Sequence, residues 1–303
     1  MRAWLGERFG GRVRFGEPLS RHTSFRIGGP ADAWVEVDSA ADILAVQRAG
    51  GEAGLPLSVL GIGTNVLVSD RGIRGLVVKL GRAFAAVEWR AEGQCMHVRA
   101  GAAGPFKKLV LAAAARGLTG LEFAEGIPGS LGGGLLMNAG AFGGEISHVV
   151  TGIVGVHPDA GERYHPRAEL RFGYRRFDLP ADLIVTHIDF ALEPGDTAAI
   201  KAKMADAKRK RDAHQPLGLP NAGSVFKNPR GHHAGRLIEA AGLKGHAIGG
   251  ASVSEKHSNF IVNPESYASA GDIEALIAYV QSAVKLRFGV ELIPEVRIVG
   301  EAE

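Results

Sequence analysis

The 303-residue chain contains very little cysteine, with Cys95 as its single thiol. One cysteine excludes an internal disulfide framework and agrees with a reducing compartment. Its strand-like surroundings favour a thiol in the core over a reactive one. The chain also lacks any apolar run of the ~18–20 residues that a membrane-spanning helix needs. Residues 1–11 include charged side chains and no apolar stretch, so we expect no signal peptide and a cytoplasmic protein that does not bind membranes.

Two common nucleotide-binding motifs are missing as well. After Gly61 and Gly63 the chain continues into β-forming residues, whereas a Rossmann fingerprint needs a third glycine and then a helix. No glycine is followed by Lys and then Ser or Thr, which excludes a P-loop. The net charge of +3 is only mildly basic, and no basic stripe is interleaved with aromatic residues. We therefore expect small anionic ligands as partners, and neither nucleic acid nor an obligate protein partner.

Glycine, by contrast, is abundant: it makes up 43 of the 303 residues, about twice the usual ~7%. Eight glycines lie within residues 125–144, EGIPGSLGGGLLMNAGAFGG. Because glycine costs about 0.5–1 kcal/mol more than alanine in regular structure, this segment is not expected to form an ordinary helix. Its composition favours backbone that closely approaches a phosphate or a flat ring. A tightly packed loop without a ligand is the alternative.

A second glycine segment, VLGIGTNVLVSD at residues 59–70, lies between two apolar runs that are typical of strands. The predicted order is therefore strand, glycine turn, strand. Backbone N–H groups in such a turn can hold a diphosphate. The presence of two such segments favours a ligand site over packed loops.

The length of the chain exceeds the size at which one core usually stops growing, so we expect two or three domains. Capping residues and apolar spacing predict helices at residues 39–50, 105–117, 197–214 and 272–288. Strands are predicted at residues 57–60, 66–68, 76–80, 87–90, 95–100, 149–157, 183–192, 259–263 and 290–299. This pattern indicates an α+β fold with mixed sheets. We expect the helix at 197–214 to connect two domains and to expose its Lys and Arg residues, Arg211 included, to solvent.

Ser224 lies in the segment NAGSVFKNP, residues 221–229. It is not a nucleophile elbow, because G-x-S-x-G needs glycine at the positions that Ala222 and Phe226 occupy. Ser224 is either a turn residue or a proton donor that the turn positions. Three other patches combine charge with rigid backbone, and each alone is typical of an ordinary surface: FGYRR at 172–176, HSNF at 257–260 and PEVR at 294–297.

Taken in order, these motifs resemble those of the bacterial UDP-N-acetylenolpyruvoylglucosamine reductases, flavoenzymes of peptidoglycan precursor synthesis. The resemblance begins at TSFRIGG, residues 23–29, and continues through LGIGTNVLVSD, GIPGSLGGGLLMNAGAFG, FGYR, NAGSVFKNP, HSNFIVN and PEVRIVG. Nearly every residue from 22 to 300 lies within it. The chain is too short between FGYR and GSVFKNP for the tyrosine-bearing loop of the family's longer subtype. It is therefore similar to the shorter subtype.

The resemblance implies a two-part FAD-binding region of the PCMH/vanillyl-alcohol-oxidase type, followed by a smaller α+β substrate-binding domain. The implied segments are residues 1–80 and 81–200 for the two FAD-binding subdomains and 201–303 for the substrate-binding domain. FAD would be bound non-covalently, and NADPH would donate hydride. The implied reaction converts UDP-N-acetylglucosamine enolpyruvate to UDP-N-acetylmuramate. No metal ligand is implied.

The resemblance also implies roles for individual residues. The catalytic set is Ser224, Arg175 and Glu295, with Ser224 as the proton donor, and further candidates for contact with the UDP-sugar are Tyr174, Lys227, Asn228 and His257. FAD contacts are implied for Gly61, Gly63, Thr64, Asn65, Gly126, Ile127, Pro128, Gly129, Ser130, Gly133, Asn138 and Gly140. The alternatives are another FAD oxidoreductase of the same cofactor fold, such as an oxidase, and a non-catalytic sugar-nucleotide-binding protein.

Overall fold

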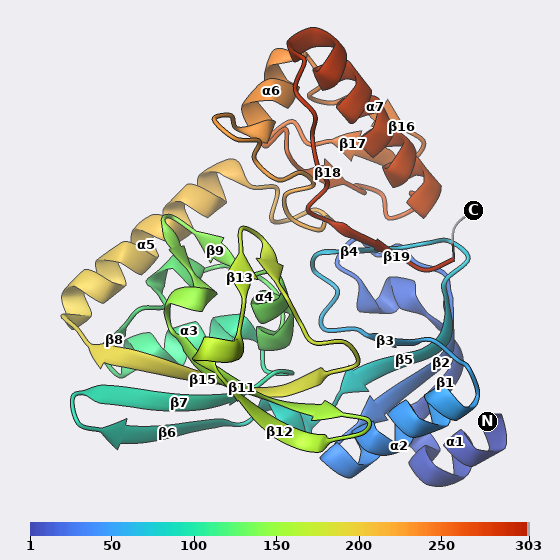
Figure 1. Cartoon of the computed structure of the whole chain (residues 1–303). Coiled ribbons are helices and arrows are strands. Elements are labelled where there is room, and N and C mark those ends of the chain that lie inside the picture. The colour runs from blue at the N-terminus through green and yellow to red at the C-terminus, as the bar shows by residue number, and fades with distance from the viewer. Residues whose placement is uncertain (302–303) are drawn as a thin grey trace. The chain divides into compact units, whose positions relative to one another are not determined.

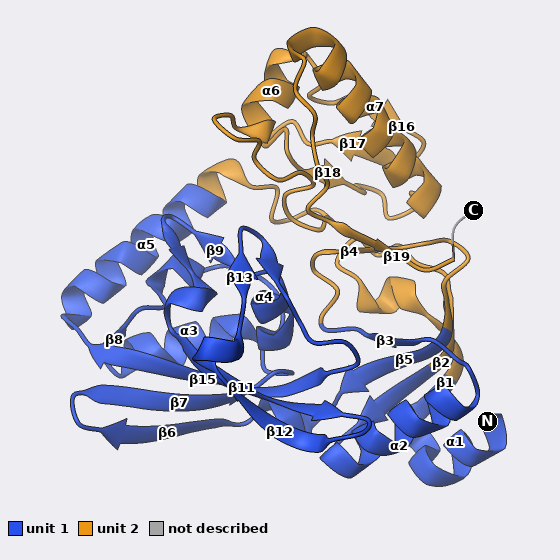
Figure 2. Ribbon diagram, viewed as in Figure 1, with its two compact units in different colours: residues 1–14, 34–61, 75–211 blue, residues 15–33, 62–74, 212–303 orange. Residues whose placement is uncertain are grey.

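The computed structural model describes residues Met1–Glu301. Contacts divide the chain into two compact units, each assembled from separate stretches of sequence (Figures 1 and 2). Unit 1 contains residues 1–14, 34–61 and 75–211, and unit 2 contains residues 15–33, 62–74 and those from 212 onward. The last boundary falls within helix α5 (Thr197–His214), the helix predicted to connect two domains. The assignment of residues 1–80, 81–200 and 201–303 to different ligands stays a prediction.

The first sheet has the strand order β1–β2–β5–β3. It consists of β1 (Val13–Pro18), β2 (Pro30–Val37), β5 (Ile73–Leu80) and β3 (Leu57–Val59). Strands β3 and β5 are parallel, with Val59 opposite Val78. Helix α1 (Arg2–Phe9) precedes this sheet, and helix α2 (Ala40–Glu52) follows β2. Helix α2 begins at the predicted cap, where Ser39 Oγ accepts the Asp42 N–H at 3.1 Å.

The second sheet of unit 1 is antiparallel and has the order β12–β11–β15–β7–β6. Its strands are β6 (Val87–Glu92), β7 (Cys95–Gly101), β11 (Val150–His157), β12 (Gly161–Pro166) and β15 (Ile184–Pro194), and the short β8 (Leu118–Thr119) pairs with the end of β15. Helix α3 (Phe106–Ala115) contacts β8, and helix α4 (Leu131–Leu136) contacts β7 and β15. The predicted strands of this unit are confirmed.

The prediction that the glycine-rich run forms no ordinary helix is wrong, because helix α4 lies within this run. Its sequence is LGGGLL, and Ser130 caps it by accepting the Gly133 N–H at 3.3 Å. A Cβ atom at Gly132 would lie 3.2 Å from the Ala102 Cβ, and one at Gly134 would lie 3.1 Å from the Phe106 ring. Close packing at these positions offsets the poor helix propensity of glycine. The run then continues into a small hairpin of β9 (Gly140–Ala141) and β10 (Gly144–Glu145).

Unit 2 is built around helix α7 (Ala270–Phe288), which packs against α6 (Ala234–Ala240) and the strands β16 (Ala247–Ile248) and β17 (Ala251–Val253). The sequence spacing predicts six residues on the buried face of α7, and five of them are buried: Ile273, Leu276, Ile277, Val280 and Val284. The sixth, Phe288, is 37% exposed at the end of the helix. Gly289 ends the helix in the left-handed conformation, with φ 68°, also as predicted. Strand β18 (Ile261–Val262) completes the three-stranded sheet.

The closing strand of unit 2 is shorter than predicted. Strand β19 covers only Arg297–Val299 and pairs in parallel with β4 (Val66–Val68). Pro294 has no N–H for a ladder, so the predicted strand at 290–299 is interrupted there. The predicted strand at 259–263 is likewise reduced to the two residues of β18.

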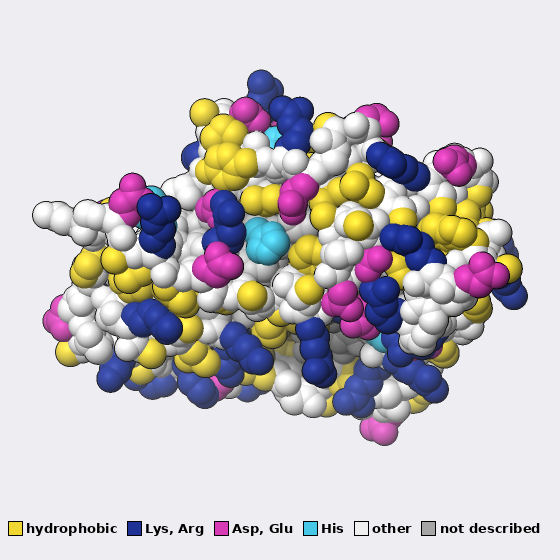
Figure 3. Space-filling view, turned by 90° about the horizontal axis from the view of Figure 1, so that it is seen from below, with side chains coloured by type: hydrophobic (Ala, Val, Ile, Leu, Met, Phe, Trp, Pro, Cys, Tyr) yellow, Lys and Arg dark blue, Asp and Glu magenta, His cyan; other side chains and the backbone are white. Residues whose placement is uncertain are grey.

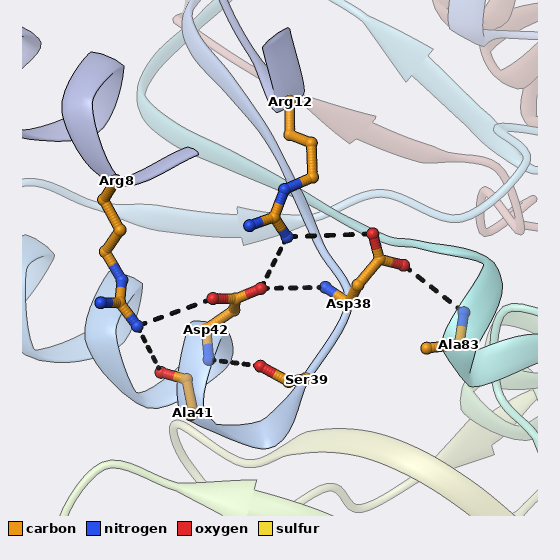
Figure 4. Close-up of polar contacts among 7 residues, drawn as sticks. All are labelled: Arg8, Arg12, Asp38, Ser39, Ala41, Asp42 and Ala83. Carbon is orange, nitrogen blue, oxygen red and sulfur yellow. Dashed lines mark hydrogen bonds and ion pairs between the residues drawn. The ribbon is translucent and has the colours of Figure 1, made fainter. Parts of the chain in front are cut away.

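A cluster of charged side chains fixes the start of α2 in unit 1 (Figure 4). Arg12 Nη1 lies 2.6 Å from Asp42 Oδ2, and Arg8 Nη2 lies 3.6 Å from Asp42 Oδ1. Burial raises the pKa of the Asp42 carboxyl. The hydrogen bonds from Arg12 and from the Asp38 N–H, together with the two arginine charges, outweigh burial and hold this pKa below its usual range.

The surface drawn in Figure 3 carries Lys and Arg interspersed with acidic and apolar side chains. This mixture agrees with the mild net charge of +3. Within residues 1–301, no helix combines the length and the apolar character needed to cross a bilayer.

Candidate active site

The two glycine segments meet in unit 1. A Cβ atom at Gly61 would lie 2.5 Å from Ser130 Oγ, and one at Gly126 would lie 2.8 Å from Arg211 Cδ. Gly126 also has φ 75°, a conformation that favours glycine. Close approach of protein groups therefore explains both glycines. The two segments lie together, and any contact with a ligand must come from their backbone and from neighbouring side chains.

The implied FAD contacts in the run 126–140 fall into two sets. Ser130 and Asn138 are only 4% and 1% exposed. Asn138 Nδ2 donates to the Gly173 carbonyl at 3.0 Å, and its Oδ1 accepts the Ser147 N–H at 3.1 Å, so this side chain supports the loop from within. The remaining positions leave backbone or apolar side chain at least partly exposed: Gly126, Ile127, Pro128, Gly129, Gly133 and Gly140.

The donor set of this region fits a dinucleotide such as FAD. Exposed backbone of the run suits the flat flavin ring, while the glycine turn after β3 leaves Gly61 partly exposed. A cation also lies beside this turn, where Lys79 Nζ donates to the Gly61 carbonyl at 2.5 Å. Backbone at a glycine turn together with a lysine is a combination that binds a diphosphate.

Arg175 is held against the same run. It lies at the turn between β13 (Phe172–Gly173) and β14 (Arg176–Phe177), with φ 53°. Its Nη2 donates to the Gly140 carbonyl at 2.7 Å, and its guanidinium lies 5.2 Å from the ring centroid of Tyr174, which is 53% exposed. The structure therefore brings a predicted catalytic cation next to a predicted FAD contact.

Arg211 is a further candidate site residue, and the prediction that it is exposed to solvent is wrong. It is only 9% exposed, whereas the prediction placed it on a solvated helix face. Burial lowers the pKa of its guanidinium, the Glu125 carboxyl raises this pKa in part, and the charge of Arg175 lowers it further. Glu125 is 7% exposed, and its Oε2 has no hydrogen-bond partner within the described chain. Arg175 and Arg211 therefore lie against the glycine-rich run, and Glu125 is the first residue of that run.

The buried stripe of α5 is the signal that would have identified Arg211. This helix buries Ile200, Met204, Ala207 and Arg211, which follow helical spacing. Its other basic residues, Lys201, Lys203, Lys208, Arg209 and Lys210, are exposed as predicted.

In unit 2, the segments that contain Ser224 and Glu295 are paired. The Glu295 N–H donates to the Val225 carbonyl at 2.7 Å, the Lys227 N–H donates to the Ile293 carbonyl at 2.9 Å, and Phe226 bridges to Pro294. Ser224 and Glu295 therefore flank one short antiparallel contact. The backbone pairing therefore holds the two segments that carry these predicted catalytic residues next to each other.

Asn259 holds this pair of segments and was not predicted as a site residue. It is 5% exposed, and its side chain bonds both peptide groups of Phe226: Oδ1 accepts the N–H at 3.0 Å, and Nδ2 donates to the carbonyl at 2.8 Å. The Asn259 carbonyl also accepts the Val225 N–H at 2.8 Å. The turn at Ser224 is thus fixed by a neighbouring buried amide.

The second half of the glycine turn lies beside Glu295. Asn65 Nδ2 donates to the Glu295 carbonyl at 3.2 Å, and the Arg297 N–H donates to the Asn65 carbonyl at 3.1 Å. Gly63 has φ 69°, and its carbonyl accepts the Ser24 N–H at 3.0 Å. Within unit 2, Asn65 therefore links the glycine turn to the backbone of Glu295.

The implied substrate contacts in unit 2 already have protein partners. Asn228 Oδ1 accepts the Ala234 N–H at 3.0 Å at the start of α6. His257 Nδ1 accepts the Asn259 N–H at 3.2 Å, and burial lowers the pKa of its imidazole. Their contact with a sugar nucleotide, like that of Lys227, stays a prediction.

Comparison with known families matches two parts of the chain. Residues 31–162 match the model described as FAD binding domain. Residues 215–299 match the model described as UDP-N-acetylenolpyruvoylglucosamine reductase, C-terminal domain. These matches define a flavin-binding enzyme of α+β class, which confirms the predicted fold class.

Relatives that cover nearly the whole chain identify the family. The chain is 49% identical to UDP-N-acetylenolpyruvoylglucosamine reductase 2 of Symbiobacterium thermophilum, with 96% of this chain and 93% of the relative covered. It is 44% identical to the reductase of Caldanaerobacter subterraneus subsp. tengcongensis, with 96% and 95% covered. The crystal structure of the reductase from Thermus caldophilus is similar, with a TM-score of 0.82, 33% identity, and 95% and 98% covered. The chain belongs to the UDP-N-acetylenolpyruvoylglucosamine reductase family.

Proposed function

We propose that this chain is an NADPH- and FAD-dependent reductase that converts UDP-N-acetylglucosamine enolpyruvate to UDP-N-acetylmuramate during peptidoglycan precursor synthesis. The observation that carries the proposal is the similarity to such reductases over nearly the whole length of the chain. One of these relatives is 49% identical, with 96% of this chain and 93% of the relative covered. Two observations support it: backbone hydrogen bonds pair the segments that contain Ser224 and Glu295, and Arg175 donates to the Gly140 carbonyl of the glycine-rich run.

The chemistry that bound FAD supplies is hydride transfer from NADPH to the methylene carbon of the enolpyruvyl group. Negative charge then develops beside the substrate carboxylate. The permanent charge of Arg175 stabilises it, and Arg211 adds a second cation near the glycine-rich run. Glu295, in its protonated form, donates a hydrogen bond to the same charge.

Ser224 gives the proton to the carbon adjacent to the reduced methylene. An aliphatic hydroxyl is a weak acid, so Ser224 needs help from its surroundings, and Lys227 or a chain of water molecules would supply that help. The Asn259 amide and the bridge from Phe226 to Pro294 hold the turn that carries Ser224 in place.

Absorption spectroscopy of the purified protein tests the function. We expect flavin bands that bleach with NADPH under anaerobic conditions and return when UDP-N-acetylglucosamine enolpyruvate is added. Acid precipitation should release all the flavin into the supernatant, because FAD is bound non-covalently. Return of colour with oxygen but not with the sugar nucleotide would indicate an oxidase, and binding of the sugar nucleotide without any bleaching would indicate a non-catalytic protein.

A further inference from the structure

Lys79 is a half-buried cation that the proposed mechanism does not use. It is the penultimate residue of β5, and its Nζ donates to the Gly61 carbonyl at 2.5 Å. Within the described chain Lys79 forms no ion pair. The charge of Glu36, on the neighbouring strand β2, raises the pKa of Lys79, but the two side chains form no ion pair.

The burial of this ammonium group is unfavourable for the protein alone. Burial lowers the pKa of Lys79, and the charge of Glu36 raises it only in part. One neutral carbonyl replaces little of the hydration that a buried ammonium loses. An anionic ligand at this position would supply the missing charge.

The position of Lys79 follows from the parallel pairing of β3 with β5, in which Val59 is opposite Val78. Gly61 follows the carboxyl end of β3, and Lys79 lies at the carboxyl end of β5. Ligands of open sheets bind outside the carboxyl ends of parallel strands. Residues 31–162, which include both groups, match an FAD-binding domain.

We propose that Lys79 is the counter-charge for the diphosphate of the dinucleotide at the Gly61 turn. An ammonium group has three donors, so the Gly61 carbonyl can keep one while phosphate oxygens accept the others. The inference rests on the proposed function, because it takes FAD as the ligand. Lys79 then contributes to the binding of the phosphate groups of FAD and not to the binding of the flavin ring.

Fluorescence titration of apoprotein, prepared from the holoenzyme, tests this role with FAD and with riboflavin, which has the same ring and no phosphate. Lys79→Met should raise the Kd for FAD by about 10- to 100-fold, the effect of losing a hydrogen bond to a charged group. The Kd for riboflavin should not change. Lys79→Arg, which keeps the charge, should recover part of the FAD affinity. Lys108→Met, at an exposed position of α3, serves as the matched control.

The dependence of the Kd for FAD on salt gives a second readout. Salt should weaken FAD binding less steeply in Lys79→Met than in wild type, because one charge contact is gone. An unchanged Kd for FAD would overturn the inference. Equal loss of FAD and riboflavin would also overturn it, since Lys79 would then only hold the Gly61 turn in shape. Wild-type apoprotein that binds neither flavin would instead contradict the proposed function.

Discussion

At the scale of single residues, the turn at Ser224 depends on contacts that do not include its own hydroxyl. The Asn259 side chain bonds both peptide groups of Phe226, and the Val225 carbonyl accepts the Glu295 N–H. Removal of the hydroxyl therefore leaves the backbone geometry in place. Substitution of Ser224 can therefore test its chemical role without a change in the structure of the turn.

In Ser224→Ala we expect folding and FAD binding to be unchanged and the two half-reactions to separate. Hydride transfer from NADPH involves no protonation at the substrate carbon, so bleaching should stay within about threefold of wild type. The substrate half-reaction loses its proton donor, so it should slow by at least about 10²–10⁴-fold. Stopped-flow absorbance of each half-reaction measures both rates.

Ser224→Cys should recover part of the lost rate, because a thiol is a more acidic donor at a slightly different distance. Ser282→Ala, at an exposed position of α7, is the matched control. Equal slowing of both halves, or no slowing of the second, would assign Ser224 a structural role and make Glu295 the next candidate for the proton donor.

At the scale of single elements, helix α2 depends on the ionised form of Asp42. Since the folded protein lowers the pKa of this carboxyl, its contribution to stability is complete above the unfolded pKa of about 3.9. That contribution is lost as the pH falls through the lower folded pKa. Asp42→Asn should therefore reduce the free energy of unfolding by about 1–2 kcal/mol at pH 7, and the difference from wild type should shrink below about pH 4.

Urea unfolding at several pH values measures this difference. Asp159→Asn, at an exposed position, is the control and should change stability little at any pH. A constant difference between Asp42→Asn and wild type down to the lowest pH would show that geometry, and not charge, is responsible.

The elements that sequence predicts best are those with local signals. Helix α7 has its apolar spacing and the cap at Gly289, and α2 has the cap at Ser39. Helix α4 has a local cap at Ser130 but poor helix propensity, and it depends on contacts with Ala102 and Phe106, which are distant along the chain. Strand β19 is shorter than predicted because Pro294, which has no N–H, interrupts the ladder, and only residues Arg297–Val299 pair with β4.

The residues of the candidate site also divide into those that sequence motifs predict and those that only contacts in the folded chain reveal. Ser224, Arg175 and Glu295 stand in motifs that resemble a known family, so the sequence predicts their catalytic roles, and those roles stay predictions. The helical spacing of Arg211 with Ile200, Met204 and Ala207 indicates its burial, but nothing in the sequence separates Asn259 from an ordinary loop residue. Their importance depends on what they contact after folding, namely Gly126 and Phe226.

At the scale of the whole molecule, we expect NADPH and the sugar nucleotide to react with the flavin in turn, because the sequence offers no second nucleotide-binding motif. Initial rates measured at several fixed concentrations of one substrate should give parallel double-reciprocal lines, with inhibition by excess sugar nucleotide. Lines that intersect would show that both substrates bind at once, and would contradict this prediction.

The integrity of unit 2 should depend on its last strand. A chain ending at Val296 keeps Glu295 but lacks β19, so the edge of β4 loses its partner. Unpaired strand edges promote aggregation, and we expect most of this variant in the insoluble fraction. A chain ending at Glu301 keeps β19 and is the control. Soluble truncated protein with an unchanged thermal midpoint would contradict the expectation.

The pairing of β4 with β19 also has a consequence for synthesis on the ribosome. The hydrogen bond from Ser69 Oγ to the Glu301 carbonyl links residues 232 positions apart. At about 5–20 residues per second, the region of β4 leaves the ribosome roughly 10–50 s before its partner is made. During that interval the nascent chain presents an incomplete strand edge, which makes it a substrate for chaperones that act before translation ends.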